Sequence, residues 1–165
     1  MLAIILISGA VNSGKTSLML DIMQEEALSG SRVTGILALS VIENGQKTGF
    51  EVLDVATGEK RMLATLHPET IAGETLISIG RYHFLEKNFK FALDILFSVD
   101  KSGAVFVDEV GPLELSGGGY ADAIRKIVSG VSGKVYISVR SSCLEKFVGM
   151  FLSGIPYTVR HTGEK

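Results

Sequence analysis

A glycine-bearing stretch near the start of the chain has the residue types and spacing needed to hold a polyphosphate. Residues 9–16 read Gly-Ala-Val-Asn-Ser-Gly-Lys-Thr and fit the pattern G-x-x-x-x-G-K-[ST] at every position. Backbone N–H groups of such a loop, together with the positive end of the following helix dipole, can surround phosphate oxygens. Gly9 and Gly14 let the backbone approach the phosphates without a Cβ clash. The stretch therefore predicts a phosphate-binding loop.

The polar residues of this loop have separate expected roles. Lys15 is expected to reach the β- and γ-phosphates as a compact charge, and the Thr16 hydroxyl to ligate Mg²⁺. The expected nucleotide-binding residues are Gly9, Ala10, Val11, Asn12, Ser13, Gly14, Lys15, Thr16 and Ser17. The alternative is an ordinary strand-to-helix turn that contains Gly and Lys by accident. An apolar run before the loop and a helical pattern after it disfavour that alternative.

Two adjacent carboxylates follow another apolar run. Residues 104–107 predict a buried strand, which Asp108 and Glu109 terminate. Asp108 is expected beside the phosphate loop, where it can hold Mg²⁺, and Glu109 is expected to point elsewhere and orient or deprotonate an attacking water. The alternative for both is a solvated acidic strand end. A phosphate loop alone indicates phosphate binding, whereas the loop and the two carboxylates together indicate hydrolysis.

A third polar group follows the apolar residues 135–139. Arg140 or Ser141 is a candidate sensor of the γ-phosphate, and Arg140 is also able to stabilise charge in a transition state. The alternative is a surface arginine next to a serine that caps the following helix. Arg81 and Arg160 are further basic candidates, each expected to be solvated or paired with an acid.

The aromatic and histidine residues give weaker indications. Tyr82, His83 and Phe84 have the types needed to stack on a nucleobase, but they are expected instead to form a short strand. His67 and His161 belong to no recognisable cluster. Base recognition is therefore not assigned to particular side chains.

The elements that must position these groups follow from the hydrophobic pattern. Apolar runs predict strands, and apolar residues at helical spacing predict helices. The predicted strands cover residues 2–8, 33–42, 49–55, 61–65, 76–79, 104–107, 135–139 and 157–159, and the predicted helices cover residues 17–28, 89–99, 120–131 and 142–152. Glu43-Asn44-Gly45 predicts a hairpin turn. Since helices and apolar strands alternate outside this hairpin, we expect one three-layer α/β/α domain over residues 1–165. We expect its mostly parallel sheet to carry an inserted antiparallel hairpin, an order that, with the loop of residues 9–16, resembles the P-loop NTPase fold.

Composition narrows the classes of function. Sixteen Lys and Arg against eighteen Asp and Glu give a net charge of −2, so no basic excess is present for nucleic-acid binding. The apolar run Leu2–Ile7 is too short to span a bilayer and lacks the flanks of a signal peptide. A single cysteine, Cys143, has no partner for a disulfide. We therefore expect a soluble cytoplasmic protein without membrane or nucleic-acid partners.

Three segments in order along the chain carry a family resemblance. They are residues 9–16, the run from Gly49-Phe50-Glu51-Val52 to Leu63-Ala64, and Val107-Asp108-Glu109-Val110-Gly111-Pro112-Leu113-Glu114-Leu115. In this combination the chain resembles the small nucleoside triphosphatases first described from thermophiles, a family with a cancer-related human member. The family usually has Arg shortly before the Gly-Phe pair, where this chain has Lys47, and Lys lacks the planar fork of Arg.

The resemblance implies a fold and an activity. It implies a single α/β P-loop domain and slow, Mg²⁺-dependent cleavage of nucleoside triphosphates of broad base specificity to diphosphate and phosphate. By position, it makes Asp108 the metal-side carboxylate, Glu109 the catalytic carboxylate and Glu114 a supporting acid.

Two other functions share the same phosphate loop. A nucleotide or small-molecule kinase would replace water by a hydroxyl group, but it needs an acceptor pocket and usually an arginine-rich lid. The six arginines are scattered along the chain, which disfavours such a lid. A nucleotide-binding switch protein with incidental hydrolysis is the third possibility. The sequence favours the hydrolase and identifies no protein partner.

Overall fold

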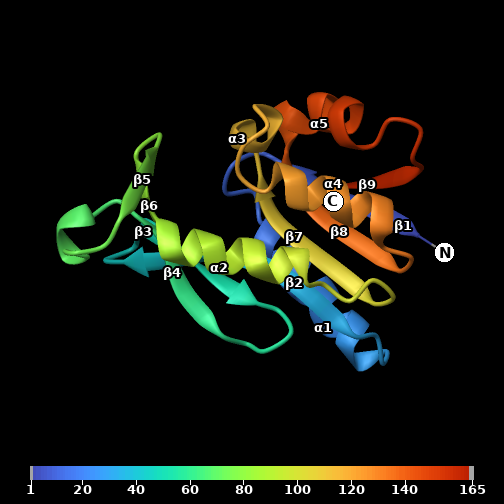
Figure 1. Ribbon diagram of the computed structural model, residues 1–165, viewed down its shortest axis with the longest axis horizontal. Coiled ribbons are helices and arrows are strands. Elements are labelled where there is room, and N and C mark those ends of the chain that lie inside the picture. Colours follow the sequence, from blue (N-terminus) through green and yellow to red (C-terminus); the bar gives the residue numbers. More distant parts are fainter. Residues whose placement is uncertain (1, 164–165) are drawn as a thin grey trace.

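The computed structural model describes residues 2–163, in which helices pack on one continuous sheet (Figure 1). The strands are β1 (Ala3–Gly9), β2 (Val33–Glu43), β3 (Gln46–Asp54), β4 (Lys60–Thr65), β5 (Leu76–Ile79), β6 (Tyr82–Leu85), β7 (Ala104–Val110), β8 (Lys134–Arg140) and β9 (Tyr157–His161). The helices are α1 (Lys15–Leu28), α2 (Glu86–Phe97), α3 (Pro112–Leu115), α4 (Ala121–Gly130) and α5 (Leu144–Phe151), with short 3₁₀ turns at Pro68–Thr70 and Ser141–Cys143.

The sheet has a parallel half and an antiparallel half. Its nine strands are ordered β5-β6-β4-β3-β2-β7-β8-β1-β9. The pairs β2–β7, β7–β8, β8–β1 and β1–β9 are parallel, whereas β2–β3, β3–β4, β4–β6 and β6–β5 are antiparallel. The predicted α/β fold with an antiparallel insertion is confirmed, but the insertion is larger than a hairpin. It extends the parallel sheet by four strands, β3 to β6.

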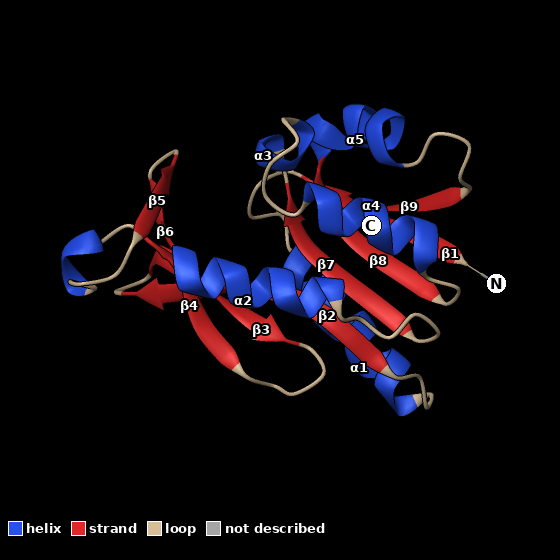
Figure 2. Ribbon diagram, in the orientation of Figure 1, coloured by secondary structure: helices blue, strands red, loops and turns tan. Residues whose placement is uncertain are grey.

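Helices cover both faces of the sheet, as the three-layer prediction requires (Figure 2). Helix α1 covers one face through Met19 and Ile22, which pack with Ile7 and Phe106. Helices α2, α4 and α5 cover the other face, where alternate residues of the same strands, such as Leu6, point. Both faces of the central strands are therefore buried, which explains their continuous apolar sequences.

Most predicted elements are present, and their boundaries differ by no more than three residues. The helix predicted at 142–152 is divided into a 3₁₀ turn and α5, and the helix predicted at 89–99 begins at Glu86. The pattern did not predict α3, a single turn that starts at Pro112. Such a turn is too short to show helical periodicity. No helix among residues 2–163 combines the length and apolar character needed to cross a membrane.

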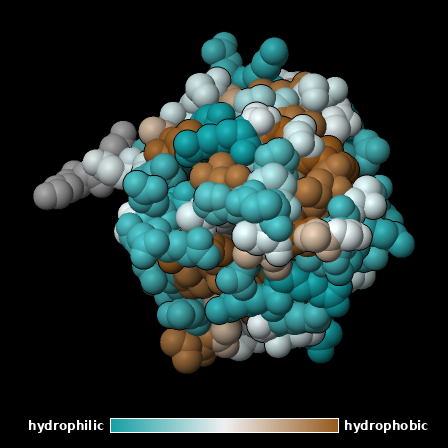
Figure 3. Space-filling model, turned by 90° about the vertical axis from the view of Figure 1, so that its left-hand side faces the viewer, coloured by the Kyte–Doolittle hydropathy of each residue, from teal (hydrophilic) through white to brown (hydrophobic). Residues whose placement is uncertain are grey.

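The antiparallel extension ends in a short edge strand. Strand β5 has four residues and pairs only through β6, and its Ile77 is exposed. Figure 3 looks onto this end of the molecule, where hydrophobic side chains are interspersed among hydrophilic ones. A short edge offers few unpaired backbone groups to another chain.

A buried carboxylate attaches the end of α1 to the sheet. The Glu26 carboxylate accepts hydrogen bonds from Lys134 Nζ (2.6 Å), Tyr136 Oη (2.6 Å) and Ser31 Oγ (2.8 Å), and its side chain is 7% exposed. Burial disfavours the charged form, but the three hydrogen bonds outweigh it and hold the pKa of Glu26 below its usual value. The group is therefore ionised and stabilising at neutral pH.

We expect Glu26→Gln to lower the free energy of unfolding by about 2 kcal/mol at pH 7, because charge-assisted hydrogen bonds are lost. Since the folded-state pKa is lowered, this contribution is complete above the ordinary pKa of 4.5 and disappears as the pH falls through the folded-state value. Urea unfolding at a series of pH values measures both effects. Glu25→Gln, at an exposed neighbour, is the control, and an equal loss in both variants would contradict the prediction.

Candidate active site

The loop of residues 9–16 connects the carboxyl end of β1 to the amino end of α1. A Cβ at Gly9 would clash with Thr162 Oγ1 and Ser13 Oγ, so a larger residue would require both side chains to move. Gly14 has φ 91°, in the left-handed region that favours glycine. Gly14 is therefore favoured by the backbone and Gly9 by the side chains around it, and the loop N–H groups gather at the start of a helix.

The lysine of the loop is folded back across it. Lys15 Nζ donates to the carbonyl oxygens of Gly9 (3.1 Å) and Ala10 (2.7 Å), and the residue is 6% exposed. Burial lowers the pKa of Lys15, while the carboxylates of Glu109 and Asp108 oppose that shift. The cation thus lies inside the loop, facing both carboxylates.

Asp108 lies beside this loop although its strand is not the neighbour of β1. Strand β8 separates β7 from β1, but the carboxyl ends of these parallel strands meet at one edge of the sheet. Asp108 Oδ2 accepts from Thr16 Oγ1 (2.8 Å) and from the Ala38 N–H (3.0 Å). The side chain is almost fully buried, as the residue is 1% exposed. The structure therefore brings together Thr16 and Asp108, the two predicted metal ligands.

Glu109 points away from Asp108 because the strand is irregular there. The pairing of β7 with β8 shifts register between Val107 and Val110, and Glu109 has φ 65°. Its N–H donates to Asp108 Oδ1 (3.0 Å) and to Ser138 Oγ (2.8 Å). A bulge of this kind re-aims a side chain at the cost of backbone strain. Asp108 thus stays buried while Glu109 faces the cleft.

The electrostatic surroundings of Glu109 are mixed. Its removal from bulk water in the cleft raises its pKa, and the negative charge of Asp108 raises it further. The cations Lys47, Lys15 and Arg140 act in the opposite direction. A carboxylate with a raised pKa that is held among cations is suited to accept a proton.

Two cavities meet at Glu109. The first, the loop cavity, measures about 210 Å³ and is lined by residues 12–17 together with Ser40, Lys47 and Glu109. The second, the aromatic cavity, measures about 490 Å³, and its wall includes Phe50, Leu63, Tyr82, Phe84, Phe89 and Tyr120. Asn12, Lys47 and Glu109 line both, so the two cavities are adjacent.

The other predicted basic candidates divide between the site and the surface. Arg140, at the end of β8, lines the aromatic cavity and a small space shared with Lys15 and Glu109, and its side chain makes no hydrogen bond or ion pair within residues 2–163. Ser141 is exposed and caps no helix through its side chain. Arg81 lines the aromatic cavity, whereas Arg160 lies exposed on β9.

The remaining candidates have separate positions. Tyr82 and Phe84 lie in strand β6 and line the aromatic cavity, and the exposed His67 is 3.4 Å from Glu69. Glu114 is buried, where its carboxylate accepts hydrogen bonds from the N–H groups of Gly111 (3.0 Å) and Tyr120 (3.4 Å). Burial raises the pKa of Glu114. Glu114 therefore fixes the turn around α3, next to the aromatic cavity.

Sequence reasoning missed one residue of the site, Ser138, and noted Lys47 only as a departure from the family pattern. Ser138 of β8 is fully buried, accepts from the Glu109 N–H and donates to Asp108 Oδ1. A lone serine in the buried strand Val135–Val139 was a usable indication of a polar partner. Lys47 of β3 lines the loop cavity, with its Nζ 4.8 Å from the centre of the Phe50 ring. Only the strand order could show that this hairpin lysine faces the loop.

We expect Ser138→Ala to lower kcat about tenfold with little change in KM, because Ser138 positions the two carboxylates without reaching the cleft. Steady-state phosphate release at a series of nucleotide concentrations separates the two constants. Ser141→Ala is the control, since Ser141 is exposed. An unchanged kcat would show that Ser138 is only a structural residue.

The oxygen atoms between the loop and β7 fit a small divalent cation. Thr16 and Asp108 supply a hydroxyl and a carboxylate 2.8 Å apart, and both are hard oxygen ligands. Residues 2–163 contain no group of three or more His, Cys, Asp or Glu side chains suited to hold a metal by themselves. This donor set suits Mg²⁺, which usually takes its other ligands from phosphates and water.

The chain is similar in sequence and in fold to known proteins. A family model described as NTPase matches residues 4–151. The nucleoside-triphosphatase THEP1 of Methanopyrus kandleri is 28% identical over 134 residues, which are 81% of this chain and 71% of that protein. The nucleoside-triphosphatase THEP1 of Saccharolobus solfataricus is 32% identical over 112 residues, 67% of this chain and 61% of that protein. The solution structure of a human cancer-related nucleoside triphosphatase has the same fold, with a TM-score of 0.70 and 22% identity over 96% of this chain and 88% of that one.

Proposed function

The chain belongs to this NTPase family and is a nucleoside-triphosphate phosphatase, and from that premise we propose how it binds and cleaves its substrate. A nucleoside triphosphate binds with Mg²⁺ between the Gly9–Thr16 loop and Asp108, and water attacks the γ-phosphorus and displaces nucleoside diphosphate, which leaves inorganic phosphate. The observation that carries this proposal is the 2.8 Å contact between Thr16 and Asp108, with Glu109 facing the same cleft.

The loop binds the phosphates. The N–H groups of residues 9–17 and the amino end of α1 surround the β- and γ-phosphate oxygens. Lys15 exchanges its two carbonyl partners in the loop for phosphate oxygens, which are charged acceptors and therefore bind it more strongly. The nucleotide binds through its phosphates more than its base, which supports broad base specificity.

Thr16 and Asp108 are the residues that would hold the metal ion. Thr16 would ligate it through its hydroxyl and Asp108 through water, and bound Mg²⁺ would supply positive charge against the charge that develops on the phosphate oxygens. Asp108 is kept in place by Ser138 and by the Ala38 N–H, so its carboxylate is oriented before the substrate arrives.

Glu109 prepares the attacking water. Its carboxylate accepts a hydrogen bond from water on the side of the γ-phosphate opposite to the leaving oxygen, and takes up the proton as the new bond forms. Arg140, which is half-buried and without a protein partner in residues 2–163, contacts the γ-phosphate and stabilises the charge of the transition state. Both groups lie on the cleft side of the loop.

The substrate is a free nucleotide in this proposal. A net charge of −2 supports a small anionic substrate chelated to a metal ion over a nucleic-acid polyanion. Nucleoside triphosphates and Mg²⁺ are abundant in the cytoplasm, where we propose that the enzyme acts.

Phosphate release from ATP, GTP, CTP and UTP tests the proposal. With MgCl₂ all four should release phosphate slowly and at comparable rates, and EDTA should stop the reaction. Lys15→Ala sets the background from contaminating phosphatases. If the natural chain releases phosphate no faster than this variant, the proposal is overturned. Activity in EDTA would show that hydrolysis does not require the metal ion.

A further inference from the structure

The aromatic cavity is too large and too apolar to serve only a water molecule. At about 490 Å³ it lies within the size range of small-molecule sites. Its wall is built from strands β3, β4 and β6 of the antiparallel extension, from α2, and from the turn that precedes α4. None of its aromatic side chains has a part in the hydrolysis of a phosphate.

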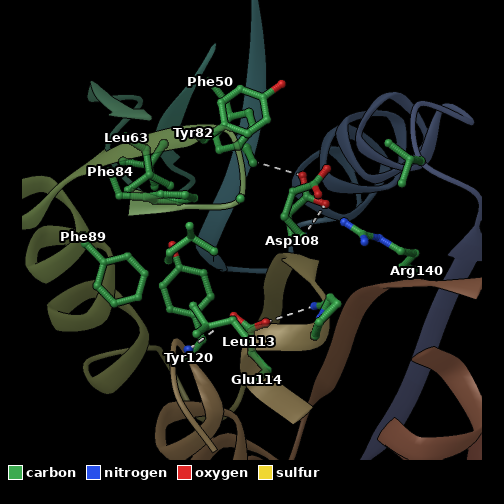
Figure 4. A pocket seen from close by; sticks show the side chains of 18 of the residues that line it. Phe50, Leu63, Tyr82, Phe84, Phe89, Asp108, Leu113, Glu114, Tyr120 and Arg140 are labelled. Carbon is green, nitrogen blue, oxygen red and sulfur yellow. Dashed lines mark hydrogen bonds between the residues drawn. The ribbon is translucent and has the colours of Figure 1, made fainter. Parts of the chain in front are cut away.

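The rings of this cavity form two groups that adjoin, because Phe84 lies 6.5 Å from Phe89 in an edge-to-face arrangement. Phe50 lies 4.9 Å from Tyr82 and 5.9 Å from Phe84 between ring centres, and these three line one side. Phe89 and Tyr120 stack at 5.1 Å with an interplanar angle of 7° and line another side, as Figure 4 shows. Such walls suit a flat ring, which gains contact with both groups.

Most charged residues of the cavity lie toward the loop cavity, although Arg81 and Glu114 also line the wall. Lys47 and Glu109 line both cavities, and Asp108 and Arg140 line the aromatic cavity on the side where Figure 4 shows them. Away from that side, Tyr120 contributes a hydroxyl that makes no hydrogen bond within residues 2–163. A ligand that fits is therefore an apolar ring with a polar group directed toward Glu109.

The position of Glu109 fixes the side of the nucleotide on which the cavity lies. This step rests on the proposed function, in which Glu109 orients the group that attacks the γ-phosphate. In-line displacement places the attacking group opposite to the leaving β-phosphate oxygen. The ribose and base extend from that leaving side, so the aromatic cavity lies beyond the γ-phosphate and does not receive the base of the same nucleotide.

We propose that the aromatic cavity binds a second substrate, a small aromatic alcohol whose hydroxyl group takes the place of the attacking water. The hydroxyl oxygen forms a bond to the γ-phosphorus, and the bond from that phosphorus to the β–γ bridging oxygen breaks. The hydroxyl proton passes to Glu109, and the products are a phosphate monoester and a nucleoside diphosphate. Hydrolysis is the reaction that takes place when water occupies the alcohol position.

Tryptophol, an indole with a primary hydroxyl group, is the probe for this site. The chain has no Trp, so indole fluorescence reports on the probe alone. We expect saturable binding by fluorescence anisotropy, and label from γ-³²P-ATP on the tryptophol hydroxyl. The matched compound 3-ethylindole lacks the hydroxyl, so it should bind and slow phosphate release without becoming labelled.

Each other outcome counts against the proposal. If tryptophol does not bind saturably, or if it binds and leaves phosphate release unchanged, the proposed binding site is overturned. Binding that slows phosphate release while all label stays in ATP and inorganic phosphate would overturn the acceptor role. Phosphate release without any probe is measured first, so a failure of the proposed hydrolysis is seen separately.

Two substitutions on strand β5 locate the probe. Ile79 lines the aromatic cavity, whereas Ile77, on the same short strand, is exposed and lies outside it. We expect Ile79→Asp to weaken tryptophol binding at least about tenfold, because a charge is placed against an apolar ligand. Ile77→Asp should leave binding within about twofold of the natural chain. Equal binding in both variants would place tryptophol elsewhere, and thermal unfolding of both shows whether they are folded.

Discussion

Lys15→Met is expected to lower kcat/KM for nucleoside triphosphate hydrolysis by about 10³-fold. Lys15 is the only cationic residue of the loop sequence 9–16. Its Nζ donates hydrogen bonds to the carbonyl oxygens of Gly9 and Ala10 in the loop. Methionine retains much of the length of the side chain but has neither charge nor N–H donors. Charge that develops on the β–γ bridging oxygen would then lack its nearest protein cation.

Nucleotide binding and stability are measured on the same variant. Since Lys15 contacts the nucleotide before and during the reaction, its loss should weaken binding as well as lower kcat. Lys60→Met, at an exposed residue of β4, is the control and should keep full activity. A Lys15→Met protein that is folded and retains a tenth of the activity would contradict the role of the loop.

Glu109→Gln is expected to lower kcat by about 10²- to 10⁴-fold while nucleotide affinity changes little. Glutamine keeps the shape and the hydrogen-bonding oxygen of the side chain but cannot accept the proton of water. Because Glu109 acts on the attacking group and not on the bound phosphates, the loss should fall on kcat. Single-turnover cleavage and nucleotide titration measure the two quantities separately.

Glu109→Gly separates the chemistry of this residue from its backbone strain. Glycine adopts φ 65° with less backbone strain than glutamate. This variant should therefore be at least as stable as the natural chain in thermal unfolding. It should nevertheless be as inactive as Glu109→Gln. A glycine variant that is clearly less stable would show that φ 65° carries no strain, and full activity in either variant would remove Glu109 from the reaction.

Local patterns predicted the part of the site that lies in consecutive residues. The loop of residues 9–16 is recognisable because its function depends on neighbouring backbone groups, and its strand and helix show their own periodicity. Asp108 and Glu109 were predicted for the same reason, since they end a buried strand. The family predicted from these segments is confirmed.

Local sequence patterns did not predict the contacts between segments that are distant in the chain. Ser138 is 30 residues from Asp108 in the chain, and Lys47 belongs to a strand whose neighbours depend on the sheet order. The bulge that turns Glu109 into the cleft arises from a shift in pairing between β7 and β8, which no single strand encodes. The sequence showed no acceptor pocket of the kind that a kinase needs. The aromatic cavity is a candidate for such a pocket.

The sequence by itself determined the strand–loop–helix unit, the paired acids and the α/β class, because each depends on the order of residues within a short segment. The tertiary structure alone decided that β8 lies between the loop strand and the acidic strand, that Ser138 holds Asp108 and the Glu109 N–H, and that rings from four segments line one cavity. The physical reason is that hydrophobic periodicity reports which face of an element is buried, whereas the identity of the neighbour is fixed only when the whole core packs.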